Sequence, residues 1–208
     1  MKKLILFTSL SILVSGILIS CGKSTKGKMD GEWKVDSYKA TSTSASGSNS
    51  SSTILTIEGT SITYINTSNS ITTTENGTVD IADWNIKKDG TWDRKLAFTI
   101  ISNGVTKKTV LVSSGNWAFQ SKIGEYKKNE RVAFSVLSES TTVTSTVGSS
   151  SIIETESATY LDGENNEVFV ITESKKKELA MELKKSSTYS NGSVSSETGE
   201  GIVKLSLK

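Results

Sequence analysis

The segment IKKDGTWDRKLAFTII, residues 86–101, decides the fold class of this chain. Its Asp89-Gly90 pair favours a tight turn, because both residue types tolerate the backbone angles that a hairpin requires. After the turn, alternate positions are apolar: Trp92, Leu96, Phe98 and Ile100. A two-residue period places these side chains on one face of a β-strand. The segment therefore predicts a hairpin in which one strand ends near Ile86 and the next begins at Thr91.

The same period recurs along the rest of the chain. Further sets that alternate in this way are Val132, Phe134 and Val136, then Leu179, Met181 and Leu183, and finally Val203, Leu205 and Leu207. Turn pairs fall between such segments: Glu58-Gly59, Asn76-Gly77, Asn103-Gly104, Asp162-Gly163 and Asn191-Gly192. We expect an all-β fold, a single antiparallel up-and-down barrel of roughly eight to ten strands, with a β-sandwich as the alternative.

Two segments break the pattern. Residues 41–53 are a low-complexity run of serine and threonine with little to bury, so we expect a mobile loop there. The charged run Lys175-Lys176-Lys177-Glu178 could begin a short helix. The residues after it, however, alternate between apolar and polar, as in a strand with one face exposed to solvent.

Composition excludes several kinds of chemistry. The 208 residues include 36 serines and 26 threonines, no proline and no histidine, and a single cysteine, Cys21. A Ser-His-Asp triad, a Cys-His dyad, a Cys/His zinc site and an internal disulfide are therefore impossible. We expect no catalytic site, metal or cofactor. The formal net charge of +2 gives no reason to expect a nucleic-acid partner.

The first twenty residues have the pattern of a secretory signal peptide: Lys2 and Lys3 precede a short apolar stretch that ends at Ser20. Leu18-Ile19-Ser20-Cys21 resembles the lipobox of bacterial lipoproteins, which implies that Cys21 is acylated and becomes the N-terminus. Residues 21–29 are expected to form the lipidated cysteine and a flexible tether, and residues 30–208 the barrel domain. Gly22 follows the cysteine at the position where an acidic residue would retain a lipoprotein at the inner membrane, so the chain resembles an outer-membrane lipoprotein. We therefore expect a lipid anchor in the cell envelope, in the outer membrane, with the domain on the periplasmic or surface face.

The layout after the tether is similar to that of the lipocalins, and in particular of small lipocalin-like lipoproteins of Bacteroidetes-type bacteria. The resemblance is carried by Gly31-Glu32-Trp33 at the start of the first strand, by the turn Asp89-Gly90-Thr91, and by the alternating residues 177–183. It implies a barrel with a cavity, with Gly31 and Trp33 as the structural signature. The tryptophan would plug the closed end, and its indole N–H would need a partner.

Arg94 is the candidate anchor for a ligand, because it alternates with Trp92 and Leu96 and so should point inward. A buried guanidinium must be paired. It could bind a ligand carboxylate or phosphate, stack on Trp92 or Trp117, or be turned outward by a β-bulge. In the first case Trp92, Phe98, Ile100 and Trp117 would line the ligand site with Arg94.

Two functions remain open. The first is a monomeric binding module, anchored to the membrane by its N-terminal lipid, whose barrel holds a small apolar or amphipathic molecule, for example a fatty acid with its head on Arg94. The second is an interaction module of the envelope with a filled barrel, which contacts protein or glycan. A cavity of about 300 Å³ or more would favour the first.

Overall fold

The computed structural model describes residues 24–46, 49–120, 129–190, 193–197 and 201–208. In these residues it has one short helix and one twelve-stranded sheet in which every pairing is antiparallel. The elements are α1 (Thr25–Met29), β1 (Gly31–Ser46), β2 (Asn49–Glu58), β3 (Ser61–Ser68), β4 (Ile71–Ile86), β5 (Thr91–Ser102), β6 (Val105–Gln120), β7 (Arg131–Val147), β8 (Ser150–Thr159), β9 (Asn165–Ser174), β10 (Glu178–Ser190), β11 (Ser193–Glu197) and β12 (Gly201–Leu207). The expected signal peptide, Cys21 and the turn at Asn191-Gly192 lie outside the described residues.

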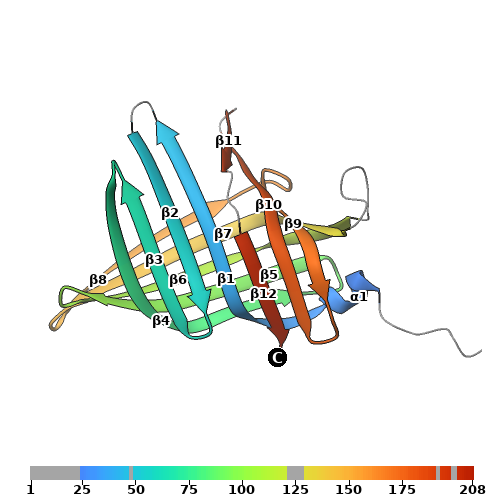
Figure 1. Cartoon of the computed structure of the whole chain (residues 1–208), viewed down its shortest axis with the longest axis horizontal. Helices are drawn as coiled ribbons and strands as arrows, with labels where there is room; N and C mark the ends of the chain where they lie inside the picture. The colour runs from blue at the N-terminus through green and yellow to red at the C-terminus, as the bar shows by residue number, and fades with distance from the viewer. Residues whose placement is uncertain (1–23, 47–48, 121–128, 191–192, 198–200) are drawn as a thin grey trace, which may run out of the picture.

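The sheet closes into a barrel, as the alternation predicts. The pairings run β1, β4, β5, β6, β7, β9, β10 and β12, and β12 pairs with β1 again, which makes a ring of eight strands. We call the part of the molecule inside this ring the closed half. Figure 1 shows α1 at its end, beside the strands that form the ring. The prediction of an all-β barrel is therefore confirmed, and the sandwich alternative is wrong.

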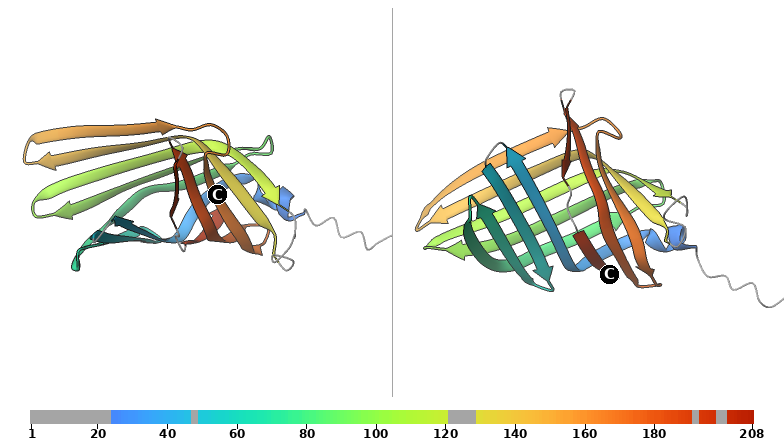
Figure 2. Two further views of the ribbon diagram at one scale, coloured as in Figure 1. Left: turned by 90° about the horizontal axis from the view of Figure 1, so that it is seen from above. Right: turned by 45° about the horizontal axis from the view of Figure 1, so that its top comes forward.

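Beyond the ring, two hairpins widen the sheet. The later part of β1, from Ser37 onward, leaves β4 and pairs with β2, so that β2 and β3 lie between β1 and β4. The later part of β7, from Ser138 onward, pairs with β8 instead of β9. We call β2, β3, β8 and the strand segments beside them the open half. Figure 2 shows the β2–β3 and β7–β8 hairpins extending away from α1 on opposite sides of this half.

Irregular pairings mark the junction between the two halves. The register shifts between Val35 and Ser37 in β1, between Val79 and Ile81 in β4, and between Ser114 and Gly115 in β6. Such bulges bend a strand and increase its twist, which a sheet needs in order to close. A Cβ at Gly115 would lie 1.9 Å from the carbonyl oxygen of Ser135, so only glycine fits where β6 and β7 approach.

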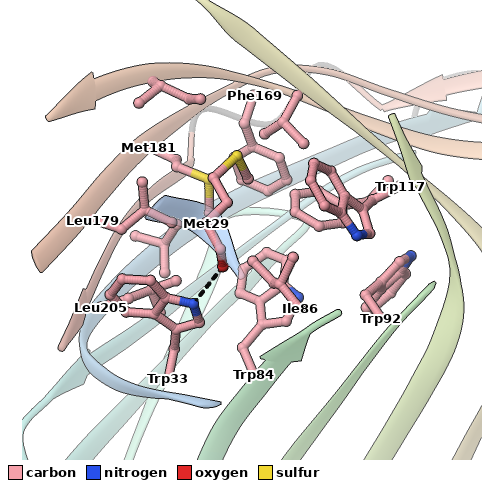
Figure 3. Close-up of a cluster of buried hydrophobic side chains, with 14 of the residues drawn as sticks. Met29, Trp33, Trp84, Ile86, Trp92, Trp117, Phe169, Leu179, Met181 and Leu205 are labelled. Carbon is pink, nitrogen blue, oxygen red and sulfur yellow. Dashed lines mark hydrogen bonds between the residues drawn. The ribbon is translucent and has the colours of Figure 1, made fainter. Parts of the chain in front are cut away.

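A single apolar core fills the closed half. Its fully buried side chains come from α1 and from strands all round the ring, and they include Met29, Trp33, Trp92, Phe134, Ile86, Leu179, Met181 and Leu205. Trp33 is 1% exposed and its indole N–H donates to the carbonyl of Met29 over 2.8 Å (Figure 3). The expected partner of this tryptophan is thus a backbone carbonyl at the end of α1.

The expected tether is shorter than the sequence indicates. Residues Thr25–Met29 form α1, Ser24 caps it by accepting from the N–H of Gly27, and Met29 is 0% exposed. The prediction of a flexible segment through Met29 is therefore wrong for α1. An unbranched Met side chain fills the end of the barrel beside Trp33, which offsets the entropy lost when the segment is ordered.

The predicted hairpin at Asp89-Gly90 is confirmed: β4 ends at Ile86 and β5 begins at Thr91. Glu58-Gly59, Asn103-Gly104 and Asp162-Gly163 also lie at turns. Asn76-Gly77 does not, because both residues are inside β4. A Cβ at Gly77 would lie 2.3 Å from the carbonyl oxygen of Thr99, so this glycine permits a close strand contact instead of a turn.

Residues 41–53 also differ from the prediction of a mobile loop. Residues 41–46 belong to β1 and 49–53 to β2, and they pair in register from Thr41 opposite Ile54 to Ser46 opposite Asn49. A ladder of this kind satisfies the backbone N–H and C=O groups of both segments. Glu178 begins β10, so the segment that could have begun a helix enters a strand.

Hydroxyl groups join neighbouring strands on the solvent side of the open half. The Thr67 and Thr72 hydroxyls lie 3.0 Å apart across β3 and β4, and those of Thr146 and Ser151 lie 2.9 Å apart across β7 and β8. Cross-strand pairs of this kind each contribute about 0.2–1 kcal/mol. They give a structural role to the large serine and threonine content.

Within the described residues, no helix combines the length and apolar character that a membrane crossing demands.

Candidate functional site

Two adjoining cavities lie where the open half meets the closed half. The inner cavity, of about 200 Å³, is lined by apolar side chains that include Leu55, Leu111 and Val203, and by a polar group around Arg94. The outer cavity, of about 270 Å³, lies towards the hairpins and is lined mainly by Leu55, Phe98, Ile100, Leu111 and Val143. Leu55 and Leu111 line both cavities. Each volume is just below the range of ordinary ligand pockets, and together they offer a longer apolar path.

Arg94 points inward from β5, as the alternation predicts. Its guanidinium is held by Glu167 of β9 through two short bonds: Nη1 donates to Oε2 over 2.7 Å and Nη2 donates to Oε1 over 2.8 Å. The guanidinium carbon also lies 5.3 Å from the ring centroid of Trp92 and 5.6 Å from that of Trp84. The two side chains of the ion pair are 29% and 18% exposed, so water reaches only part of the pair.

The pair fixes the charge of the inner cavity. Burial alone would lower the pKa of Arg94, but the charge and the hydrogen bonds of Glu167 outweigh it and raise the pKa above its ordinary value. Tyr38, which also lines the cavity, has its pKa raised, first by burial and then by the charge of Glu167, while Arg94 opposes the shift. Arg94 therefore stays charged, and its charge is already balanced.

A second carboxylate adds negative charge to the inner cavity. Glu139 of β7 lines the inner cavity and accepts a hydrogen bond from the hydroxyl of Tyr160. That hydrogen bond is the main cause of the raised pKa of Tyr160. Asp83 and Lys95 also line the cavity, lie opposite each other in β4 and β5, and balance in charge. With Glu167 and Glu139 beside the single guanidinium of Arg94, the polar part of the cavity therefore opposes a further anion.

One buried polar group beside the inner cavity has no partner among the described residues. Three of the four tryptophans donate to backbone carbonyls: Trp33 to Met29, Trp92 to Asn116 and Trp117 to Lys87. Trp84 is 3% exposed and its N–H has no acceptor among the described residues. An unsatisfied buried donor costs free energy, so Trp84 is a weak point of the packing beside the inner cavity.

The predicted site residues are divided between the cavities and the core. Arg94 lines the inner cavity, and Phe98 and Ile100 line the outer one. Trp92 and Trp117 line neither of them and instead pack in the closed half, where Figure 3 shows them beside Ile86. Of the alternatives for Arg94, stacking on Trp92 is present, and no register shift turns its strand outward.

Sequence reasoning missed the partner of Arg94. Glu167 alternates with Phe169 and Ile171, both buried, and this period could have indicated that its carboxylate points inward. Tyr38 gave a weaker signal, because the bulge in β1 between Val35 and Ser37 interrupts the alternation there. Residues 162–164 form the turn before β9, and the Asn166 side chain at the start of β9 donates to the carbonyl of Gly163.

Comparison with known proteins identifies no relative: no family model, no curated protein and no solved structure matches this chain.

Proposed function

We propose that this protein is a lipid-anchored binding module of the cell envelope, with a lipocalin-like barrel that holds a small amphipathic molecule in the two cavities. The two adjoining cavities carry this proposal, because both are lined mainly by apolar side chains and share Leu55 and Leu111. Tyr38 lines the inner cavity, where its hydroxyl would donate to a ligand oxygen.

The apolar part of the ligand would lie in the outer cavity. Leu55 and Leu111 form the passage from the inner cavity, and Phe98, Ile100 and Val143 provide the apolar wall. Burying a methylene group contributes about 0.8 kcal/mol, so a chain of moderate length is enough for micromolar binding.

The polar end would be uncharged or cationic, which corrects the expectation of a fatty acid bound through Arg94. Both terminal nitrogens of that arginine are held by Glu167, and Glu139 lies at the same cavity. An anionic head would have to displace Glu167 and then remain near two carboxylates.

A series of ligands with one chain and different heads tests this proposal. We expect 1-decanol and decylamine, below their aggregation limits, to bind in the micromolar range by calorimetry and to change the tryptophan emission. We expect decanoate to bind at least about tenfold more weakly, because its charge is opposed in the site. Equal or tighter binding of decanoate would refute the assignment of the polar end.

Two neighbouring residues of β6 provide a matched pair of variants. Leu111 points into both cavities, whereas Val112 is 39% exposed on the other face. Leu111→Trp should fill the passage and abolish binding, and Val112→Trp should leave it unchanged. If both variants bind 1-decanol as the parent does, the cavities are not the binding site.

The anchor is a separate part of the proposal, which rests on the lipobox resemblance at Cys21. We propose that the lipidated chain lies in the outer membrane, where the helix α1 at the closed end would leave the open half facing away from the lipid (Figure 1). Cys21→Ala should release the protein from membranes. If this variant still sediments with membranes after a high-salt wash, which screens electrostatic attachment, the lipoprotein assignment fails.

A further inference from the structure

Strand β8 has an unpaired edge. It pairs with β7 over its whole length, and among the described residues no strand pairs with its other side. Eight of its residues, 150–157, are exposed. The N–H and C=O groups of alternate residues along that edge are therefore free to form a ladder with another strand.

The edge lacks most of the features by which proteins block such pairing, apart from charged side chains on its inner face. Its register with β7 is continuous from Ser150 to Thr159, so no bulge twists it away. It contains no lysine, arginine or proline. Ile152 and Ile153 are each 67% exposed, one on either face. A long, regular edge with exposed apolar side chains is suited to accept a strand.

The charges of β8 are confined to one face. Glu154 lies opposite Val143 and Glu156 opposite Thr141, and these two β7 residues line the cavities. Both glutamates therefore share the inner face of the sheet. The outer face of β8 carries only Ser151, Ile153, Thr155, Ser157 and Thr159. A strand docked here would meet two carboxylates two residues apart.

These carboxylates oppose pairing of β8 with a second copy of itself. In an antiparallel pair, residues directly opposite share a face. The two registers of greatest overlap would place Glu154 opposite Glu154 of the second copy, or Glu154 opposite Glu156 and Glu156 opposite Glu154. Like charges in direct opposition destabilise a strand pair.

We propose that β8 is a docking edge for an extended segment of another protein that carries lysine or arginine at alternate positions. The segment would add one antiparallel strand beyond β8, with its basic side chains against Glu154 and Glu156 and apolar side chains near Ile153. Main-chain hydrogen bonds would supply affinity, and the two carboxylates would select the partner. This site is independent of the cavities.

The hairpin geometry shows where the docked strand would bond. Val147 and Ser150 flank a two-residue turn in which Gly148 has φ of 57°. They therefore form a hydrogen-bonded pair, and by alternation the N–H of Ser157 points away from β7. Proline at this position would block the outer ladder and spare the pairing with β7.

A pair of synthetic peptides tests the proposal on the full chain. One peptide of about nine residues alternates lysine with valine, and the other has glutamate in place of lysine. We expect the lysine peptide to bind at least about tenfold more tightly and to slow hydrogen exchange at β8. The double variant Glu154→Lys/Glu156→Lys should reverse this preference. Glu58→Lys, on the β2–β3 hairpin, is the matched control and should not change it.

Ser157→Pro separates strand addition from simple charge attraction. We expect it to abolish peptide binding while the circular dichroism spectrum is unchanged. If the lysine peptide binds Ser157→Pro as well as the parent, or binds without protecting β8 amides, the edge is not the site. If the parent dimerises in sedimentation and Ser157→Pro does not, β8 pairs with itself and the assignment of a basic partner is wrong.

Discussion

The closed and open halves share the long strands β1, β4, β5, β6 and β7 but are stabilised differently. In the closed half, aromatic rings pack in close contact, with the Trp84 and Phe134 centroids 4.9 Å apart and those of Trp92 and Phe134 5.4 Å apart. In the open half, Ile71 and Ile152 are 72% and 67% exposed, and hydroxyl pairs join the strands. The open half has only a small buried cluster, in which Ile57 and Ile62 of β2 and β3 pack with Phe98 and Ile100, and beyond it the backbone ladder is sufficient to extend the strands.

Truncation of a side chain in the closed half should cause the largest loss of stability. We expect Trp33→Ala to lower the free energy of unfolding by about 3–5 kcal/mol, because it leaves a cavity beside Met29 and removes a buried hydrogen bond. Urea denaturation measures the loss.

The matched truncation lies in the open half. Ile152→Ala should change the free energy of unfolding by about 0.5 kcal/mol or less, since the side chain is already mostly in water. Similar losses in Trp33→Ala and Ile152→Ala would mean that the two halves do not differ in packing.

The ion pair at the junction should show an intermediate effect. Arg94→Met leaves the carboxylate of Glu167 largely buried and without its partner, and we expect a loss of about 2–3 kcal/mol. This is less than for a fully buried pair, because water reaches part of it. The double variant Arg94→Met/Glu167→Leu should regain most of the stability in thermal unfolding. A double variant no more stable than Arg94→Met would argue against coupling between the two side chains.

The smallest effect concerns pH. The folded pKa of Tyr38 is raised above its unfolded value, mainly by burial, so the folded state keeps this proton longer. Stability from this group is complete below the unfolded pKa, near pH 10, and is lost as the pH rises through the folded pKa. Tyr38→Phe should therefore lose less stability than the parent between pH 9 and pH 11, as measured by urea denaturation. Parallel losses in the two proteins would show that Tyr38 is not the responsible group.

The sequence predicted the closed half better than the open half. The alternation around Trp92, Val132, Leu179 and Val203 identified the buried faces, because each of those strands has one face packed in the core. The same method missed the strands at residues 41–53, where no apolar alternation exists. It also misjudged Gly77, because glycine at a turn and glycine at a close strand contact look alike in a sequence.

The candidate site could be predicted only in part. The inward direction of Arg94 follows from its neighbours in β5, but its partner lies 73 positions away in the chain. The prediction of a ligand at Arg94 assumed that the interior held no counter-charge, and Glu167 supplies one. The sequence does not indicate that the indole N–H of Trp84 lacks an acceptor, because the partner of each tryptophan depends on how the four rings are packed.

The ring of the closed half also determines the order in which the chain can fold. The β2–β3 and β7–β8 hairpins join neighbouring segments, so each can form as soon as its own residues are free. Closure is different: the hydroxyl of Ser206 in β12 donates to Asp36 in β1, 170 positions away. Contacts of such long range form slowly, because the whole intervening chain must be restrained first. Until β12 lies between β1 and β10, two strand edges and the aromatic core remain open to other chains.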